Sequence, residues 1–560
     1  MSAVPDYAAD RYLDWDEVVA HLEALVASAP AWARLDVAGQ SREGRDIPIL
    51  TIGAQDGGAD ERPGFWLDAG THCAEWTGVM AALHTATRWI AGLRDGDGPT
   101  RAWFEGHTAY VLPCMSPDGY VAMRAGAPFL RSTLRPPRDG RPRVGLHPSD
   151  LDGDGRVRWM RWRHPAGTWV FDDPANVAKM RPRTLDDDPS TAYFVADEGV
   201  FLDWDGVRWL EASREFGQDL NRNFPSSWTP FEMFGMDSGD YPLSEPESRA
   251  TVEAFRARPR IGAALSNHTY TGCILTHPYR EPSVLGDQDL FMLRALAKGA
   301  VAGTGYRVFK VMPEFTYDPK KPIVGVWADA LATTFGVAGY TLELWDPYAF
   351  AGKAVEEPAK LFVEPDMEIL HAVLDAFRDE PGAILDWKPF DHPQLGAVEI
   401  GGIEYMTTVR NPPERLLAEE CDRGFMVADR LRRSLPTVRA EARTEALGGG
   451  LTRVELMVEN LGFLPTSSLQ RAETIGMAPP LHARASGLEL VEGVAHQALG
   501  WLDGWGAIQA SSAHHPIYVG LPADRGHRAR AVWVVRGEGA LAIQWDAGRG
   551  GRGSLSVAVG

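Results

Sequence analysis

Apolar positions in the first part of the chain alternate between helical and strand-like spacing. Residues 15–28 carry an apolar stripe at helical spacing, and Asp14 or Asp16 can cap its start. Uninterrupted apolar runs predict strands at 47–52, 65–68, 109–112, 261–266 and 339–344. Helical spacing recurs over about 75–94, 246–257, 288–302 and 357–378. Strands that alternate with helices predict an α/β fold, in which helices cover both faces of a sheet.

Residues 136–215 interrupt this rhythm, because they are rich in Arg, Asp, Trp, Pro and Gly. Within them, the runs 156–162 and 168–171 are joined through Pro165-Ala166-Gly167, which predicts a β-hairpin. We therefore interpret residues 136–215 as an insertion that is not part of the sheet.

The pattern changes again after about residue 382. Residues 454–458 and 531–535 are strand-like among Gly-rich turns, which is typical of an antiparallel β-sandwich. A helical pattern at 414–434 is expected to pack where the two domains meet. The predicted organisation is an α/β domain at 1–382, a connecting segment at 383–435 and a β-sandwich domain at 436–560.

Composition and charge exclude some classes of partner. The 560 residues are 44% hydrophobic and 24% charged, with a formal net charge of -20, which argues against a nucleic-acid or membrane-surface partner. No stretch approaches the roughly 18 apolar residues of a membrane span, and the first residues lack a secretory signal pattern. Four cysteines are too few for a disulfide framework, so we expect a cytoplasmic protein. The oligomeric state stays open.

The first candidate chemistry follows the apolar run 65–69. His72 and Glu75 lie three residues apart, so an imidazole and a carboxylate can converge from one turn of chain. A catalytic zinc ion needs a third protein ligand and an open position for water. Alone, the pair is weak evidence, because a His and a Glu at this spacing usually lie on a solvated face.

Further motifs follow in order, several of them directly after predicted strands. They are Ser116-Pro117-Asp118-Gly119, Arg131, Asp219-Leu220-Asn221-Arg222-Asn223-Phe224, His268 and Glu343. Together with Gly39-Gln40-Ser41-Arg42-Glu43-Gly44-Arg45, they resemble the zinc carboxypeptidase A family over roughly residues 5–380. The resemblance implies a catalytic domain at 1–382 with that family's mixed β-sheet flanked by helices, and one zinc ion per chain.

By this resemblance, His72, Glu75 and His268 are the zinc ligands, the family's set of two histidines and one glutamate. The insertion accounts for a separation of the two histidines that is longer than usual. Glu343 resembles the family's general base, which takes a proton from the attacking water and returns it to the leaving amine. The alternatives are a core histidine for His268 and a strand-end Glu paired with an Arg for Glu343.

Arginine and amide side chains carry the rest of the resemblance. Arg131 matches the arginine that stabilises the developing oxyanion, with Arg135 and Arg161 as rivals. Asn221 and Arg222 match the residues that hold the terminal carboxylate, which a guanidinium fork binds bidentately. The alternative for this pair is a turn that stabilises the edge of the sheet.

The chain departs from the family at substrate-facing positions. Ala74 stands where the family has an Arg, and Ser116 where it has an Asn. The family's mobile tyrosine should lie within 318–323, which contains none, although Tyr317 stands nearby. These differences leave the metal chemistry intact and leave the substrate open.

An acidic loop in the insertion offers a second candidate metal site. Asp150, Asp152 and Asp154 have the oxygen spacing of the first half of a calcium loop. Position twelve is Arg161 instead of the bidentate Glu, so we favour an Asp/Gly turn and keep Ca²⁺ as the alternative. The predicted hairpin either roofs the active site or packs on the body of the domain.

The sequence thus predicts a zinc-dependent hydrolase that removes a C-terminal residue from a peptide or small amide with a free carboxylate. One alternative is an amidase that acts on a small N-acyl amino acid or a modified peptide. Another is a catalytically silent binding protein that keeps the pocket. Glu343 argues against the silent protein, because a binding module has no need of a general base.

Overall fold

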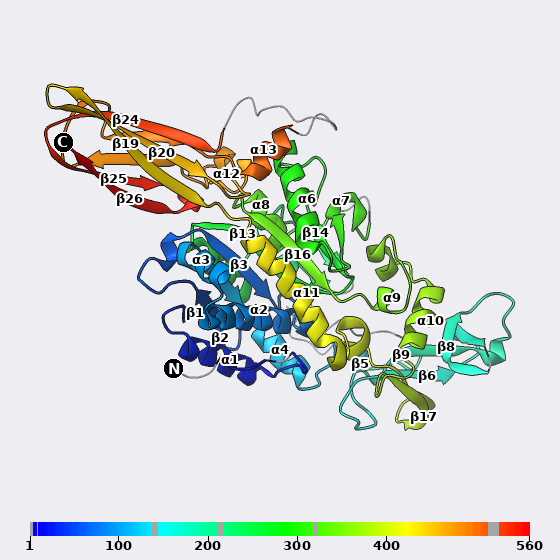
Figure 1. Cartoon of the computed structure of the whole chain (residues 1–560). Helices are drawn as coiled ribbons and strands as arrows, with labels where there is room; N and C mark the ends of the chain where they lie inside the picture. The colour runs from blue at the N-terminus through cyan, green and yellow to red at the C-terminus, as the bar shows by residue number, and fades with distance from the viewer. Residues whose placement is uncertain are drawn as a thin grey trace.

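A mixed eight-stranded sheet forms the centre of the computed structural model, which describes residues 4–560 apart from 8, 137–143, 174, 210–211, 213–217, 234–235, 319–321 and 513–525. The strand order is β1-β2-β4-β3-β13-β16-β14-β15 (Figure 1). The strands are β1 (Ala33–Gln40), β2 (Asp46–Ile52), β3 (Gly64–Ala69), β4 (Thr108–Leu112), β13 (Ile261–Thr269), β14 (Cys273–Thr276), β15 (Arg307–Lys310) and β16 (Ala338–Leu344). The central strands β4, β3, β13 and β16 are parallel, so their carboxyl ends meet at one edge.

Helices cover both faces of this sheet, and the predicted α/β fold is confirmed. On one face, α1 (Trp15–Ser28), α2 (Trp76–Asp95), α6 (Asp287–Val301) and α11 (Glu414–Arg432) bury their apolar stripes in a common core. On the other face, α5 (Pro246–Arg256) and α8 (Trp327–Thr333) pack around Phe255 and Trp327. A capping box between Asp14 and Glu17 starts α1 at the predicted residue.

The remaining helices are short. They are α3 (Gly98–Gly106), α4 (Pro117–Arg124), α7 (Val311–Glu314), α9 (Pro347–Phe350), α10 (Met367–Ala376), α12 (Gln470–Thr474) and α13 (Trp505–Ser512). Among the described residues, none of the helices is both long and apolar enough to cross a bilayer.

The predicted helix at 357–378 is wrong in its first half. Pro358–Phe362 forms only a short 3-10 turn. Pro365 cannot donate a backbone hydrogen bond, and the Asp366 side chain accepts from the N–H groups of Glu368 and Ile369 to start α10 afresh. The apolar pattern is continuous across this break, which is why periodicity alone merged the two segments.

The insertion builds a separate antiparallel sheet with the segment that follows the α/β domain. Its order is β17-β18-β6-β9-β7-β8. The strands are β6 (Trp159–Arg163), β7 (Trp169–Asp173), β8 (Asn176–Pro182), β9 (Tyr193–Asp197), β17 (Ile384–His392) and β18 (Gly396–Ile403). The short antiparallel pair β5 (Gly145–Pro148) and β10 (Gly199–Leu202) packs against this sheet, and a second short pair is formed by β11 (Glu232–Met233) and β12 (Met236–Asp237). The insertion therefore stays out of the central sheet, as predicted.

The predicted hairpin between β6 and β7 is wrong. β9 lies between the two strands: Arg161 pairs with Val195, and Trp169 pairs with Tyr193. The turn at 165–167 is present, but β7 does not pair with β6 after it. Pairing with β9 is specified by side chains about thirty residues away, which a local turn pattern does not report.

Helix α11 is part of the core of the α/β domain. Leu417, Cys421, Val427 and Leu431 are fully buried within the cluster that contains α2 and α6. The expectation that this helix packs at the junction of the two domains is therefore wrong for most of its length. Its amphipathic pattern indicated a buried face without identifying what covers it.

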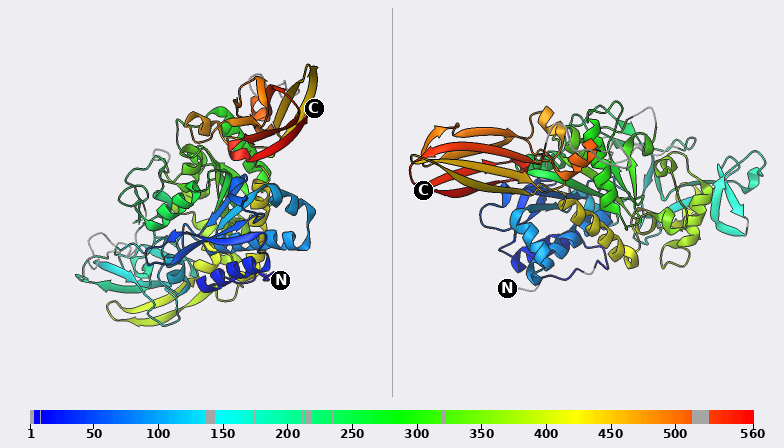
Figure 2. Two further views of the ribbon diagram at one scale, coloured as in Figure 1. Left: turned by 90° about the vertical axis from the view of Figure 1, so that its left-hand side faces the viewer. Right: turned by 45° about the horizontal axis from the view of Figure 1, so that its top comes forward.

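The C-terminal strands form two four-stranded antiparallel sheets, β19-β20-β24-β22 and β23-β21-β25-β26, which confirms the predicted β-sandwich. They are β19 (Val438–Gly448), β20 (Leu451–Asn460), β21 (Leu481–Ser486), β22 (Glu489–Glu492), β23 (His496–Gly500), β24 (Arg528–Arg536), β25 (Gly539–Asp546) and β26 (Arg552–Val559). Val454, Leu456 and Val458 alternate inward toward Trp533. The sandwich lies at the opposite end of the molecule from the insertion sheet (Figure 2).

Arg549 joins the sandwich to the α/β domain. The side chain is buried, and its Nη1 donates to the carbonyls of Gly336 at 2.6 Å and Ser467 at 2.7 Å. Its Nη2 donates to the carbonyl of Phe335 at 2.6 Å. A buried charged donor shared by three carbonyls is worth more than a surface ion pair.

We expect Arg549→Met to lower the free energy of unfolding by about 2–4 kcal/mol, because three buried carbonyls lose a charged donor. Urea denaturation followed by tryptophan fluorescence measures the change. Arg552→Met is the matched control: Arg552 is exposed and lies 3.5 Å from Glu61, so its loss should cost less than about 0.5 kcal/mol. Equal losses in the two variants would contradict the role of Arg549.

Candidate metal centre and active site

The carboxyl ends of β3 and β13 bring three buried side chains together. His72 and Glu75 lie in the turn between β3 and α2, and His268 lies on the adjacent strand β13. His72 Nδ1 is 2.9 Å from Glu75 Oε1, and His268 Nδ1 is 2.9 Å from Glu75 Oε2. The two Nδ1 atoms are 3.0 Å apart. Strands far apart in sequence thus aim three ligand atoms at one point.

The donor set fits zinc. Ligand atoms around a tetrahedral zinc ion, each at about 2.1 Å from the metal, lie roughly 3.4 Å from one another. The observed separations are only slightly shorter, and two imidazole Nδ1 atoms that face each other are natural ligands for one cation. Two histidines and one glutamate also leave a coordination position open, as catalytic zinc sites require.

Asp219 orients one of these ligands. Its Oδ1 lies 3.0 Å from His72 Nε2, so the proton of His72 is held at Nε2 and Nδ1 is left as an acceptor. Burial opposes ionisation of Asp219, but Arg222 and Arg131 hold the pKa of its carboxyl well below the usual range. Asp219 was not among the predicted site residues. Its position two residues before Asn221, within a quoted motif, was the available signal.

Glu343 lies beside the three ligands. In the parallel pairing of β13 with β16, Glu343 is directly opposite His268. Burial raises the pKa of Glu343 to about 7; His268 opposes this shift and the carboxylate of Glu75 adds to it. A carboxylate that titrates near neutrality can both take and return a proton.

Of the three candidate arginines, the structure brings only Arg131 to the ligands. Its Nη1 lies 3.2 Å from Glu75 Oε1, and its Nε lies 3.4 Å from Asp219 Oδ2. Arg135 pairs with Asp237, and Arg161 pairs with Glu399 inside the insertion sheet. Arg131 is therefore placed to donate to an oxygen that gains charge near the ligands.

The two residues of the predicted carboxylate clamp, Asn221 and Arg222, lie next to each other, and their binding role stays a prediction. Arg222 lines the active-site cavity, and its Nε has no hydrogen-bond partner among the described residues. Asn221 is buried beside it, and its amide oxygen accepts from the backbone N–H of Trp327 at 3.0 Å. The bond to the start of α8 uses only the amide oxygen of Asn221, so both residues remain candidates for binding a substrate carboxylate.

The active-site cavity has a volume of about 1540 Å³ and is walled by three parts of the chain. The insertion contributes Arg156 and Trp159, so it borders the active site instead of packing elsewhere. Tyr317 lines the same cavity as Glu343. Residues 319–321, within the segment where the family's tyrosine is missing, lie outside the described part of the chain.

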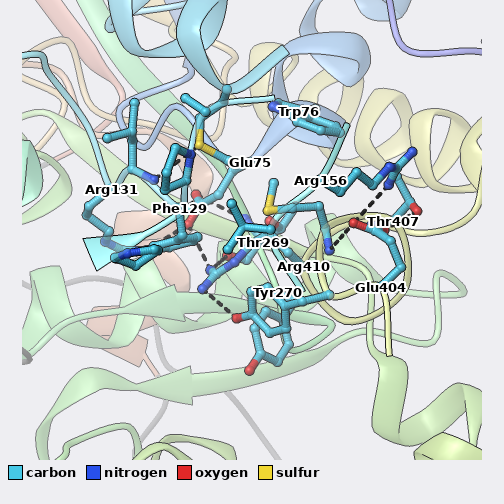
Figure 3. Close-up of a pocket in the computed structure, with 18 of the residues that line it drawn as sticks. Glu75, Trp76, Phe129, Arg131, Arg156, Thr269, Tyr270, Glu404, Thr407 and Arg410 are labelled. Atoms are coloured by element: carbon cyan, nitrogen blue, oxygen red, sulfur yellow. Dashed lines mark hydrogen bonds and ion pairs between the residues drawn. The ribbon is translucent and has the colours of Figure 1, made fainter. Parts of the chain in front are cut away.

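A further wall comes from a segment that the sequence analysis missed, residues 404–411. Arg410 Nη1 donates to the carbonyl of Thr269 at 3.1 Å and lies 3.4 Å from Glu75 Oε1 (Figure 3). Asn411 accepts from Thr77 N–H and donates to the carbonyl of Ala74 at 2.9 Å. No local motif marks these residues, and more than three hundred residues separate them from the ligand turn.

The acidic loop of the insertion does not support a calcium ion. Asp150 accepts from the N–H groups of Gly153 and Gly155, and Asp152 accepts from that of Asp154. These oxygens serve their own turn, as in an Asx-type loop. Glu198 lies close enough to complete an acidic group, but its carboxylate also accepts backbone N–H groups.

A sequence profile described as zinc carboxypeptidase matches residues 18–161 and 194–378, more than half of the chain. The chain therefore belongs to the zinc carboxypeptidase family. The gap in the match lies within the insertion. A second profile, described as a domain of unknown function, matches residues 438–558, which is the β-sandwich.

Similar proteins include carboxypeptidases and a metallocarboxypeptidase that is named as inactive. Carboxypeptidase B of Astacus astacus is 31% identical over 110 residues, which is 20% of this chain and 34% of that protein. Carboxypeptidase A2 of Rattus norvegicus is 31% identical over 140 residues, 25% of this chain and 32% of that protein. Inactive metallocarboxypeptidase ECM14 of Ajellomyces capsulatus is 28% identical over 155 residues, 27% of this chain and 24% of that protein. The matches span about a third of these relatives or less.

A solved structure of bovine thrombin-activatable fibrinolysis inhibitor, in complex with tick carboxypeptidase inhibitor, superposes with a TM-score of 0.42 and 15% identity. The superposition covers 76% of this chain and 98% of that one.

Proposed function

We propose that this protein is a zinc-dependent hydrolase that removes a C-terminal residue from a peptide or peptide-like substrate. The observation that carries the proposal is the position of Glu343 beside His72, Glu75 and His268, in a cavity that Arg131 also lines. Family membership supports the same chemistry. A protein that only bound peptides would need neither three convergent ligands nor a neighbouring carboxylate with a raised pKa.

Each side chain then has a defined task. A bound zinc ion supplies Lewis-acid chemistry and makes water a stronger nucleophile at neutral pH. Glu343 takes the proton of the attacking water and returns it to the leaving amine. Arg131 donates to the carbonyl oxygen as negative charge builds on it. Arg222, together with the amide NH2 group of Asn221, binds the terminal carboxylate and so selects the end of a chain.

The shape of the cavity favours short substrates. A volume of about 1540 Å³, walled by the insertion and by residues 403–415, accommodates a short peptide. This enclosure also suits an amidase that acts on a modified peptide with a free carboxylate. Both activities use the same attack on an amide carbonyl, and the position of the free carboxylate in the substrate distinguishes them.

We expect the purified chain to hold one zinc ion, and Asp219→Asn to weaken zinc binding by about 10–100-fold, because His72 loses the carboxylate that fixes its proton. Competition with a chelator of known affinity measures the change. Asp46→Asn, on the exposed start of β2, is the control and should bind like the wild type. Zinc content well below one ion per chain in the wild type would contradict the proposed metal centre. Unchanged zinc affinity in Asp219→Asn would contradict the role of Asp219.

We expect Glu343→Gln to lower kcat by about 10²–10⁴-fold with zinc content unchanged, because the amide cannot take the proton of water. Turnover of C-terminally free and C-terminally amidated peptides is the measurement. Glu105→Gln, at an exposed position of α3, serves as the control. Undiminished turnover by zinc-loaded Glu343→Gln would overturn the hydrolase mechanism. Equal turnover of free and amidated peptides by the wild type would overturn the role of Arg222.

A further inference from the structure

Residues 404–411 form a strap that holds Arg410 in the active site. At one end, the Glu404 carboxylate accepts from the Thr407 N–H and pairs with Arg156 of the insertion at 2.9 Å. At the other end, Asn411 bonds to the ligand turn through Thr77 and Ala74. The match to the family profile ends at residue 378, so the strap lies outside it. Figure 3 shows Arg410 between Glu75 and Tyr270.

The Arg410 guanidinium keeps donors for a ligand. The Cζ atom of Arg410 lies 5.6 Å from the ring centre of Phe129, 5.1 Å from that of Tyr270 and 5.5 Å from that of Tyr405. The guanidinium has five N–H groups. One donates to Glu75, one to the Thr269 carbonyl and one to the Tyr405 hydroxyl. The Nε–H has no partner among the described residues. A guanidinium in an aromatic setting, with part of its fork unused, is suited to a carboxylate.

Three arginines stand in a row across the cavity. Arg410 and Arg131 both contact Glu75 Oε1, at 3.4 and 3.2 Å. Arg131 also contacts Asp219, which caps the short turn Leu220–Arg222 that carries Arg222. The order is therefore Arg410, Arg131, Arg222, with one carboxylate between each pair. If Arg222 binds the terminal carboxylate of the substrate and Arg131 faces the scissile carbonyl, Arg410 faces the residue on the acyl side of the scissile bond.

The charge of the cavity favours a second anion. Among the described residues, its lining contains seven arginines and seven Asp or Glu side chains. A divalent metal ion therefore makes the loaded cavity positive, inside a chain whose net charge is -20. One terminal carboxylate does not neutralise that excess, and a second carboxylate does.

We propose that Arg410 binds a carboxylate on the acyl residue of the substrate, so that the preferred substrates are short peptides with an acidic residue immediately before the scissile bond. This specificity rests on the proposed hydrolase function. The strap, which lies outside the match to the family profile, supplies the group that recognises the acyl side of the scissile bond.

The test compares N-acetyl dipeptides that differ only in Glu or Gln as the acyl residue. We expect the wild type to favour Glu by about tenfold or more in kcat/KM, and the ratio of kcat/KM between the Glu and Gln peptides to fall to about one in Arg410→Gln. Arg410→Lys keeps the charge without the fork and should restore part of the preference. Arg433→Gln, on the exposed end of α11, is the control and should match the wild type.

A second measurement separates this inference from the proposed hydrolase. Calorimetric binding of the same two peptides to zinc-loaded Glu343→Gln, with and without Arg410→Gln, should show the same preference in Kd. If the wild type turns over neither peptide but the Kd values keep the Arg410-dependent preference, the proposed hydrolase function is contradicted and the proposed role of Arg410 is supported. Equal Kd values for the two peptides, or an equal loss of both on Arg410→Gln at full zinc content, would overturn the inference.

Discussion

The buried Glu75 carboxylate is the group on which the architecture of the site depends. It is 2% exposed, so its charge must be compensated inside the protein. Its partners come from separate parts of the chain: His72 in the same turn, His268 on β13, and the guanidinium groups of Arg131 and Arg410. The central sheet positions the two histidines, and the strap positions Arg410. A fold that failed to bring these segments together would leave an unpaired anion in its core.

The positions of the candidate site residues could be predicted where they directly follow or end a predicted strand. The ends of β3, β13 and β16 carry His72, His268 and Glu343, and an apolar run followed by a polar residue is readable without a structure. Prediction failed where pairing is distant. Nothing near Arg410 predicts that it reaches Glu75, just as no turn signal predicts that β9 separates β6 from β7. In both cases the position of the segment depends on residues distant in the sequence, and the local pattern does not report it.

In the proposed enzyme, catalysis and substrate recognition come from different parts of the chain. The parallel strands position the ligands and Glu343, and this part is matched by the family profile. Much of the remaining cavity wall comes from the insertion, whose lining residues 155–159 still fall inside the match, and from the strap at 404–411, which lies outside it. These two parts are joined to each other, because β18 pairs with β6 and Glu404 pairs with Arg156. A family site can therefore acquire a new acyl-side wall without any change to the strands that hold its ligands.

In the proposed enzyme, the metal has an electrostatic task in addition to its chemical one. The described lining of the cavity balances arginines against carboxylates, so the excess positive charge arrives only with the divalent ion. A substrate with two carboxylates gains most from that excess. Because coupling between two ligands is reciprocal, such a substrate must also hold the metal more tightly. The guanidinium row from Arg410 to Arg222 then orients the two carboxylates, while the zinc site determines whether the cavity attracts them at all.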